Sequence, residues 1–125
     1  NEYLEVNNII MPKMAASLKK VGIAGKSLNG AIVNQNLYVI KTREDLEPEY
    51  LALFLKSKWG QRKLQIMASG TTIQTINRKN LENLSIPFPD RKEQNKIVQE
   101  VKKEQEKNSL EVHQKRIKEF QKKLV

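Results

Sequence analysis

The chain has 125 residues, of which 38% are hydrophobic and 30% are charged, so it has room for one small domain and an appended element. It contains no cysteine, which excludes disulfides and thiolate metal sites and fits a cytosolic protein, and no apolar run approaches the roughly 20 residues that cross a bilayer. Lys and Arg number 23 against 14 Asp and Glu, a net charge of +9 that attracts nucleic acid, an acidic membrane surface or an acidic protein.

The cations are unevenly distributed along the chain. Residues 9–43 contain Lys or Arg at several positions and no carboxylate, and residues 51–81 repeat this pattern. The acids between these two windows cluster within residues 44–49. We therefore expect a positive face that is segregated from the acidic groups.

The first 43 residues have the pattern of short strands. Apolar runs at 3–6, 9–11, 21–24, 31–33 and 37–40 are separated by turn-forming residues. Asn7-Asn8 is expected to form a turn. Asn29-Gly30 predicts a tight turn between the runs at 21–24 and 31–33, because both residues tolerate positive φ. Pro12 lacks an amide donor and should end a strand or lie at a sheet edge.

Helical periodicity begins at Glu47-Pro48-Glu49, where proline suits the first turn and the acids favour the positive end of the helix dipole. This helix is expected to pause near Gly60 and to resume over 61–68. Asn77 is expected to cap a short helical turn that reaches residue 84. The proline-rich segment 85–89 cannot be helical and is predicted to be an extended strap.

Asp90 with Glu93 has the spacing of a capping box and begins the last element. Residues 91–125 contain neither Gly nor Pro, which allows one helix of up to about 50 Å at 1.5 Å per residue. Its apolar residues form an imperfect coiled-coil seam. Residues 102–109 carry no apolar side chain, so the helix either kinks or lies exposed there. The residues expected to pair with a partner helix are Ile97, Val101, Leu110, Ile117, Phe120 and Leu124.

The residue groups that most enzymes need are missing from the sequence. One histidine, His113, lies on the last helix and is expected to be packed or exposed rather than reactive. No carboxylate cluster has metal-ligand spacing, and no glycine-rich phosphate loop precedes a helix. We therefore predict no catalytic residue, no metal site and no cofactor.

Two segments carry the cations and short polar side chains that DNA-binding proteins use. Lysine and arginine attract phosphate, and amide or hydroxyl groups read base edges in the major groove. The alternative for both segments is a polar loop that serves the fold without touching DNA. The candidate contacts are Lys13, Lys19, Lys20, Lys26, Ser27 and Asn29 in the first segment, and Thr71, Thr72, Gln74, Thr75, Arg78 and Lys79 in the second.

The order of the motifs resembles a known family over about residues 9–125. Pro48-Glu49-Tyr50-Leu51, Ser69-Gly70-Thr71 and Ile73-x-x-Ile76-Asn77 follow one another. The most specific part is Ile86-Pro87-x-Pro89 leading into Glu93-Gln94-x-x-Ile97-Val98. This pattern is similar to the target-recognition domain of type I restriction-modification specificity subunits.

The resemblance implies an α+β fold, with a small mixed recognition domain over 1–89 and a long spacer helix over 90–125. It implies sequence-specific binding of double-stranded DNA, and assembly with methyltransferase and restriction subunits. The helix would pair with the helix that follows a second recognition domain. Because the family's recognition domain is longer and occurs twice, we expect either part of a larger subunit or a half-length subunit that acts as a homodimer.

Two other interpretations remain open at this stage. The recognition domain could stand at the end of a fused DNA methyltransferase. The chain could instead be a noncatalytic basic module that binds RNA or an acidic partner and oligomerises through its helix. Only seven aromatic residues are available, and those near the helices are expected in the core, so stacking on single-stranded bases is disfavoured.

Overall fold

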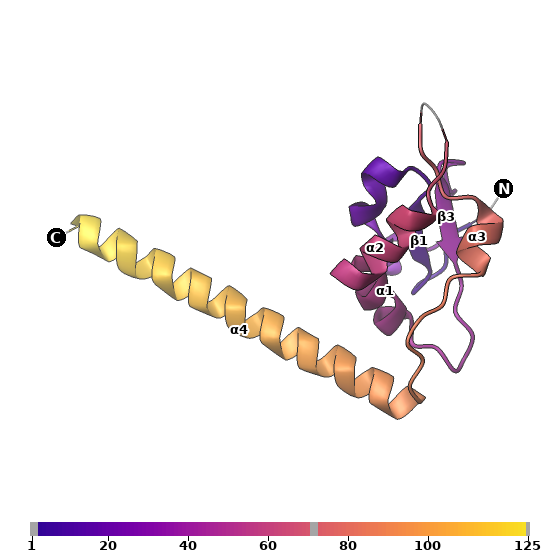
Figure 1. Ribbon diagram of the computed structural model, residues 1–125. Coiled ribbons are helices and arrows are strands. Elements are labelled where there is room, and N and C mark those ends of the chain that lie inside the picture. The colour runs from indigo at the N-terminus through magenta and orange to yellow at the C-terminus, as the bar shows by residue number, and fades with distance from the viewer. Residues whose placement is uncertain (1–2, 71–72, 125) are drawn as a thin grey trace.

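The computed structural model describes residues 3–70 and 73–124, with the side chains of 113, 117 and 120–124 outside that description. A small group of strands and helices forms the body, and one long helix projects from it (Figure 1). The predicted fold class is confirmed. The elements are β1 (Ile9–Pro12), η1 (Ala15–Lys20), β2 (Gly22–Ile23), η2 (Lys26–Leu28), β3 (Leu37–Ile40), α1 (Pro48–Lys56), α2 (Lys58–Met67), α3 (Arg78–Glu82) and α4 (Arg91–Leu124), where η marks 3-10 helices.

The three strands form an antiparallel sheet with the order β2-β1-β3. In β1, Ile9 lies opposite Ile23 on one side and Ile40 on the other. Side chains alternate between the faces of a strand, so Ile9 and Met11 point to the same face, where both are fully buried. Strand β1 is therefore the centre of the sheet and one wall of the core.

Part of the strand pattern predicted for the first 43 residues is wrong in detail. Residues 15–20 form the 3-10 helix η1, because Ala15 and Leu18 stand three residues apart and are both buried on one side of it. Residues 31–33 do not pair with 21–24: the carbonyl of Ala31 accepts from the Leu4 amide at 2.8 Å. The Ala31 carbonyl is therefore hydrogen-bonded to the backbone of Leu4 rather than to a strand of the sheet.

The two predicted turns are present, with backbone angles that refine them. Asn7 has a positive φ of 72°, as the Asn7-Asn8 pair suggested. At the second turn only Gly30 has a positive φ, 84°, while Asn29 lies at −60°. The Ala31 amide donates to the Leu28 carbonyl at 3.0 Å, so Leu28 to Ala31 form a type II turn.

The predicted pause near Gly60 is misplaced by three residues. The break between α1 and α2 is at Ser57, whose hydroxyl accepts from the Gly60 amide at 3.0 Å and caps α2. Gly60 lies inside α2, where an added Cβ would stand 1.9 Å from the Phe54 carbonyl oxygen. Glycine is thus present for close packing of α2 against the end of α1 rather than as a helix breaker.

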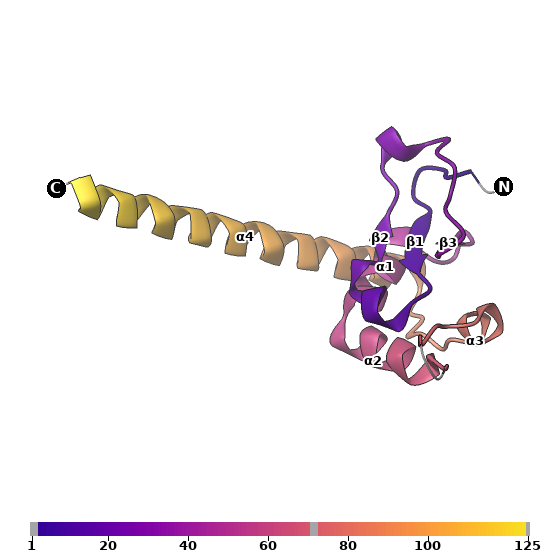
Figure 2. The same ribbon diagram turned by 90° about the horizontal axis from the view of Figure 1, so that it is seen from above.

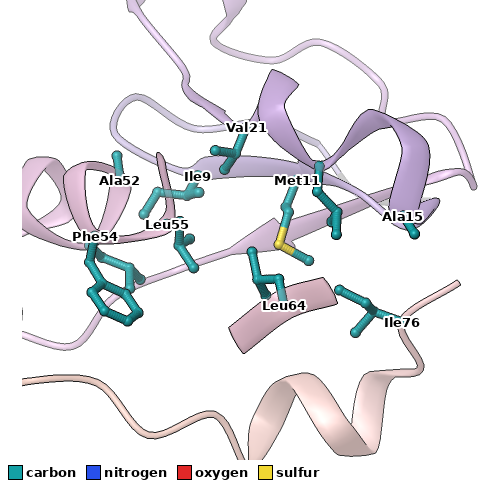
Figure 3. Packing of buried hydrophobic residues seen from close by; sticks show 11 residues of the cluster. Ile9, Met11, Ala15, Val21, Ala52, Phe54, Leu55, Leu64 and Ile76 are labelled. Carbon is teal, nitrogen blue, oxygen red and sulfur yellow. The ribbon is translucent and has the colours of Figure 1, made fainter. Parts of the chain in front are cut away.

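The core lies between the sheet and the helix pair α1 and α2. Figure 3 shows Ile9 and Met11 of β1 facing Leu55 of α1 and Leu64 of α2. Leu18 of η1 and Ile76, which precedes α3, are also fully buried and belong to the same cluster. Residues from both acid-free windows therefore meet in one core.

Helix α4 is a single unbroken helix, and its first turns pack against α1. Val98 is buried there, and Lys102 forms an ion pair with Glu49 of α1. From residue 103 onward every side chain that the structure describes is exposed. Of the two expectations for residues 102–109, exposure is correct and a kink is wrong; Figure 2 shows the helix extending away from the body without a bend.

Candidate nucleic-acid interface

The loop over residues 69–76 is tied to the chain on both sides. Thr75 pairs with Ser69 across the loop and with Met14, which follows β1. The Ala15 amide donates to the Gln74 carbonyl and the Ile76 amide donates to the Lys13 carbonyl, each at 2.9 Å. These bonds bring the second predicted DNA segment against the start of the first.

The backbone hydrogen bonds of this loop leave the side chains of Gln74 and Thr75 facing solvent. Gln74 and Thr75 are both exposed, while Ile76 is fully buried and anchors the loop in the core. Ile73, the other isoleucine of this motif, is 63% exposed. Thr71 and Thr72 lie outside the described residues. The loop therefore exposes an amide and a hydroxyl on a backbone that is held in place.

Tyr38 of β3 fastens the base of this loop. Its hydroxyl donates to the Ile76 carbonyl at 2.7 Å. The Lys13 ammonium lies 4.8 Å from the centre of the Tyr38 ring, a cation–π distance. Burial raises the Tyr38 pKa, with a smaller opposing effect from Arg78, so the hydroxyl remains a donor at neutral pH.

Two further predicted cations follow the loop at the start of α3. Asn77 caps this helix as predicted, because its side chain accepts from the Asn80 amide at 2.7 Å. Arg78 and Lys79 are exposed. Arg78 forms an ion pair with Glu82 at 2.9 Å, and because both groups are well exposed this pair is weak and can exchange for a phosphate. The loop thus has cations at its base.

The remaining residues of the first segment separate into two places. Lys19 and Lys20 are exposed at the end of η1, and η1 is held on α2 by Gln61 and Gln65, which donate to the carbonyls of Leu18 and Ala15. A different set lies around η2, on the other side of the sheet from α3 in Figure 2. That exposed set comprises Lys26, Ser27 and Asn29.

The acidic residues 44–49 are used at the junction with α4. Glu47 forms an ion pair with Arg91, and Glu49 with Lys102. Meanwhile η1 and α2, which pack together, both belong to acid-free windows. Thus η1 and α2 contain cations and no carboxylate, whereas Glu47 and Glu49 lie at the helix junction and are paired with cations of α4.

The sequence model of one protein family, described as Type I restriction modification DNA specificity domain, matches residues 1–121. The chain belongs to this family.

A solved structure supports the same assignment. The chain is similar to the HsdS subunit from Thermoanaerobacter tengcongensis, with a TM-score of 0.73 and 26% sequence identity. The match covers 86% of this chain and 28% of that subunit, so the chain spans less than a third of it. No curated protein matches the sequence.

The motifs that resemble the specificity family have identifiable roles in the fold. Gly70 has a φ of 129°, and a Cβ there would stand 2.5 Å from the Ile73 carbonyl oxygen, so the loop needs glycine at this position. Tyr50 donates to the Pro87 carbonyl at 2.8 Å and holds the strap against α1. Asp90 accepts from the Glu93 amide at 2.8 Å and caps α4 as predicted. Each motif thus fixes a connection between elements.

The predicted helix-pairing set of this specificity-domain chain is divided by the structure. Ile97 and Val101 are half-buried in the part of α4 that packs on its own body. Leu110 is 62% exposed, and Val112 beside it is exposed as well. The side chains of Ile117, Phe120 and Leu124 lie outside the description. Leu110 is therefore the predicted pairing residue whose side chain is described and open to a partner.

Sequence reasoning did not single out two exposed cations near η1. Lys58 and Arg62 are exposed on α2, which packs against η1 and its lysines. Their only signal in the sequence was membership of an acid-free window.

Within residues 3–70 and 73–124, no group of His, Cys, Asp and Glu could hold a metal ion. None of the helices described there has an apolar stretch that could span a bilayer.

Proposed function

We propose that this chain reads the sequence of double-stranded DNA as a recognition module of a type I restriction-modification specificity subunit. The observation that carries the proposal is the 69–76 loop. It exposes Gln74 and Thr75, and Lys13 and Arg78 both lie near Tyr38 at its base. In this proposal the chain binds and positions DNA, and partner subunits supply the chemistry.

The cations would hold the DNA backbone. Arg78 and Lys79 at the loop base, with Lys19 and Lys20 on η1, are exposed and can each neutralise a phosphate. Each neutralised phosphate releases counterions, so affinity falls as salt rises. These contacts orient the duplex without reading its sequence.

The loop would read bases. A glutamine amide can donate to and accept from the edge of adenine in the major groove, and a threonine offers a hydroxyl and a methyl group. The Gln74 carbonyl accepts from the Ala15 amide, and Thr75 exchanges two backbone hydrogen bonds with Ser69. The backbone is therefore held in place, and little of its conformational freedom is lost when the side chains bind. Fixed backbone with exposed side chains is what selective contact requires.

Helix α4 would join the module to its assembly. Its outer part carries exposed Leu110, and Ile117 and Leu124 continue the seven-residue spacing in the sequence. We propose that this part pairs with the helix of a second recognition module, in the same subunit or in a second copy. Methyltransferase and restriction subunits are the proposed partners of the paired helices.

The test is the methylation pattern of cells that carry the parent gene. We expect one bipartite methylated sequence, absent when the gene is deleted. Gln74→Ala should relax one base pair of one half-site, since a bidentate contact discriminates by about 1–3 kcal/mol. The matched control is Gln105→Ala, an exposed glutamine on α4, which should leave the pattern unchanged.

Asn29→Ala tests the other side of the sheet. If it alters the target while Gln74→Ala does not, the recognition surface lies around η2 and the loop assignment is wrong. If deletion of the gene changes no methylation, the proposed function itself fails.

A further inference from the structure

Gln94, in the first turn of α4, is fully buried. Its Oε1 accepts from the Glu47 amide at 2.7 Å. Its Nε2 donates to the carbonyls of Asp45 at 3.0 Å and Pro89 at 2.8 Å. One side chain thus links α4 to the backbone of the loop before α1 and of the strap before α4.

The contacts around Gln94 define a joint, which we take as residues 91–102 of α4 with the segments they touch. Arg91 binds the Glu47 carboxylate and the Glu44 carbonyl. Lys102 binds Glu49 at the other end. Beyond Lys102, every described side chain of α4 is exposed. The direction of α4 relative to the body is therefore set within its first 12 residues.

Because α4 extends far beyond this joint, a small change in its angle moves its far end by several ångströms. Residues 103–124 extend roughly 33 Å at 1.5 Å per residue. A tilt of about 10° would move the end of such an arm by about 6 Å, whereas one base pair adds about 3.4 Å along the duplex. Reading two half-sites at a fixed separation therefore demands a stiff joint.

Gln94 is better suited to stiffness than the ion pairs beside it. Both of its amide hydrogens and its oxygen are used, and its partners are backbone groups that would lose these bonds in the partly buried joint if the side chain were removed. Lys102 and Glu49 are each about half exposed, so solvent and salt weaken that pair.

We propose that Gln94 is a positioning residue that fixes the angle of α4 against the recognition body, and thereby sets which separation of half-sites the assembled subunit accepts. The second half of this statement rests on the proposed function. The first half concerns the chain alone and can be tested without DNA.

The first experiment measures the spread of the angle. Cysteines introduced at Gln35 and Lys107, both exposed, accept spin labels without interference because the chain has no cysteine of its own. Pulsed electron resonance on labelled chain diluted with unlabelled chain gives the distance distribution within one molecule. We expect a narrow distribution for Gln94 and a clearly broader one for Gln94→Met, which keeps the volume but loses all three hydrogen bonds.

The matched control is Gln99→Ala, an exposed glutamine just over one turn further along α4, which should leave the distribution narrow. Thermal melting of each variant reports whether the body is folded. An unchanged distribution in Gln94→Met would overturn the proposal. Unfolding of the body in both Gln94→Met and Gln94→Ala would also overturn it, since Gln94 would then serve folding rather than position.

The second experiment uses the parent subunit assembled with its methyltransferase on DNA whose half-sites are separated by varied spacers. Gln94→Met should lower the preference for the native spacer over spacers one base pair longer or shorter by about tenfold, the effect of roughly one hydrogen bond. The half-site sequences should not change. Broad distances with unchanged spacer preference would overturn the link to spacing; absence of any sequence-specific methylation would instead refute the proposed function and leave the joint standing.

Discussion

Replacing Gly60 by alanine introduces a methyl group where the backbone of α1 leaves no room. The added carbon would stand 1.9 Å from the Phe54 carbonyl oxygen, while ordinary contact begins at 3.4 Å, so 3.4 − 1.9 = 1.5 Å of movement is needed. The obstacle is backbone and cannot rotate away. Overpacking costs about 1–3 kcal/mol, and the upper end of that range applies here because backbone must move; the better helix propensity of alanine returns up to about 1 kcal/mol.

We expect a net loss of about 2 kcal/mol, which lowers the melting temperature of a domain of this size by roughly 10 °C. Circular dichroism on heating measures it. The control is Gly25→Ala, where nothing lies within 4 Å of the added carbon and φ is −85°. A melting temperature of Gly60→Ala equal to that of Gly25→Ala would refute the packing argument for α1 and α2.

Three further outcomes follow from the charges, the long helix and the buried tyrosines. Lys19→Ala with Lys20→Ala should weaken binding to every duplex and reduce the slope of log affinity against log salt by up to about 2; an unchanged slope would show that neither lysine meets phosphate. Removing residues 103–125 should abolish helix-mediated assembly in light scattering while the body still melts cooperatively. Because burial raises the pKa of Tyr38 and Tyr50 above 10.0, their contribution to stability is complete below that pH and is lost above it, so alkaline unfolding should be less steep in Tyr50→Phe.

Local signals in the sequence were sufficient where a side chain acts on its own neighbours. Pro48 begins α1, Asn77 caps α3 and Asp90 caps α4, because each effect lies within three or four residues. Gly60 was misread for the opposite reason. Its neighbour in space is the Phe54 backbone, and a sequence pattern cannot distinguish a helix break from a close approach.

The candidate site was predictable as residue types but not as an arrangement. The pairing of Thr75 with Met14 joins positions 61 residues apart, and no pattern in either segment predicts that they pair. Lys26 and Asn29 looked equivalent to Lys19 and Lys20 in the sequence, yet they belong to η2 and its C-cap rather than to η1, and the two 3-10 helices lie apart in Figure 2. In the sequence, Gln94 was identified only as part of the family motif. Its role could not be predicted, because two of its three hydrogen bonds reach the distant segment before α1, which only the fold brings close.

The two tasks that we assign to the chain should respond differently to salt. Phosphate contacts depend on charge, so DNA binding weakens steeply as salt rises. In the proposed joint the hydrogen bonds of Gln94 join uncharged groups and Val98 packs in the contact with α1, and neither depends on charge. The ion pairs of Arg91 and Lys102 are partly exposed and add little.

The distance distribution between labels on the body and on α4 should therefore stay equally narrow when salt is raised until duplex binding is lost. If the distribution broadens in parallel with the loss of binding, the exposed ion pairs, rather than Gln94, hold the helix. In that case Lys102→Ala at low salt would reproduce the broadening, and an intact Gln94 would not prevent it. A narrow distribution at high salt, together with a broad one in Gln94→Met at low salt, assigns the stiffness to hydrogen bonds and the affinity to charge.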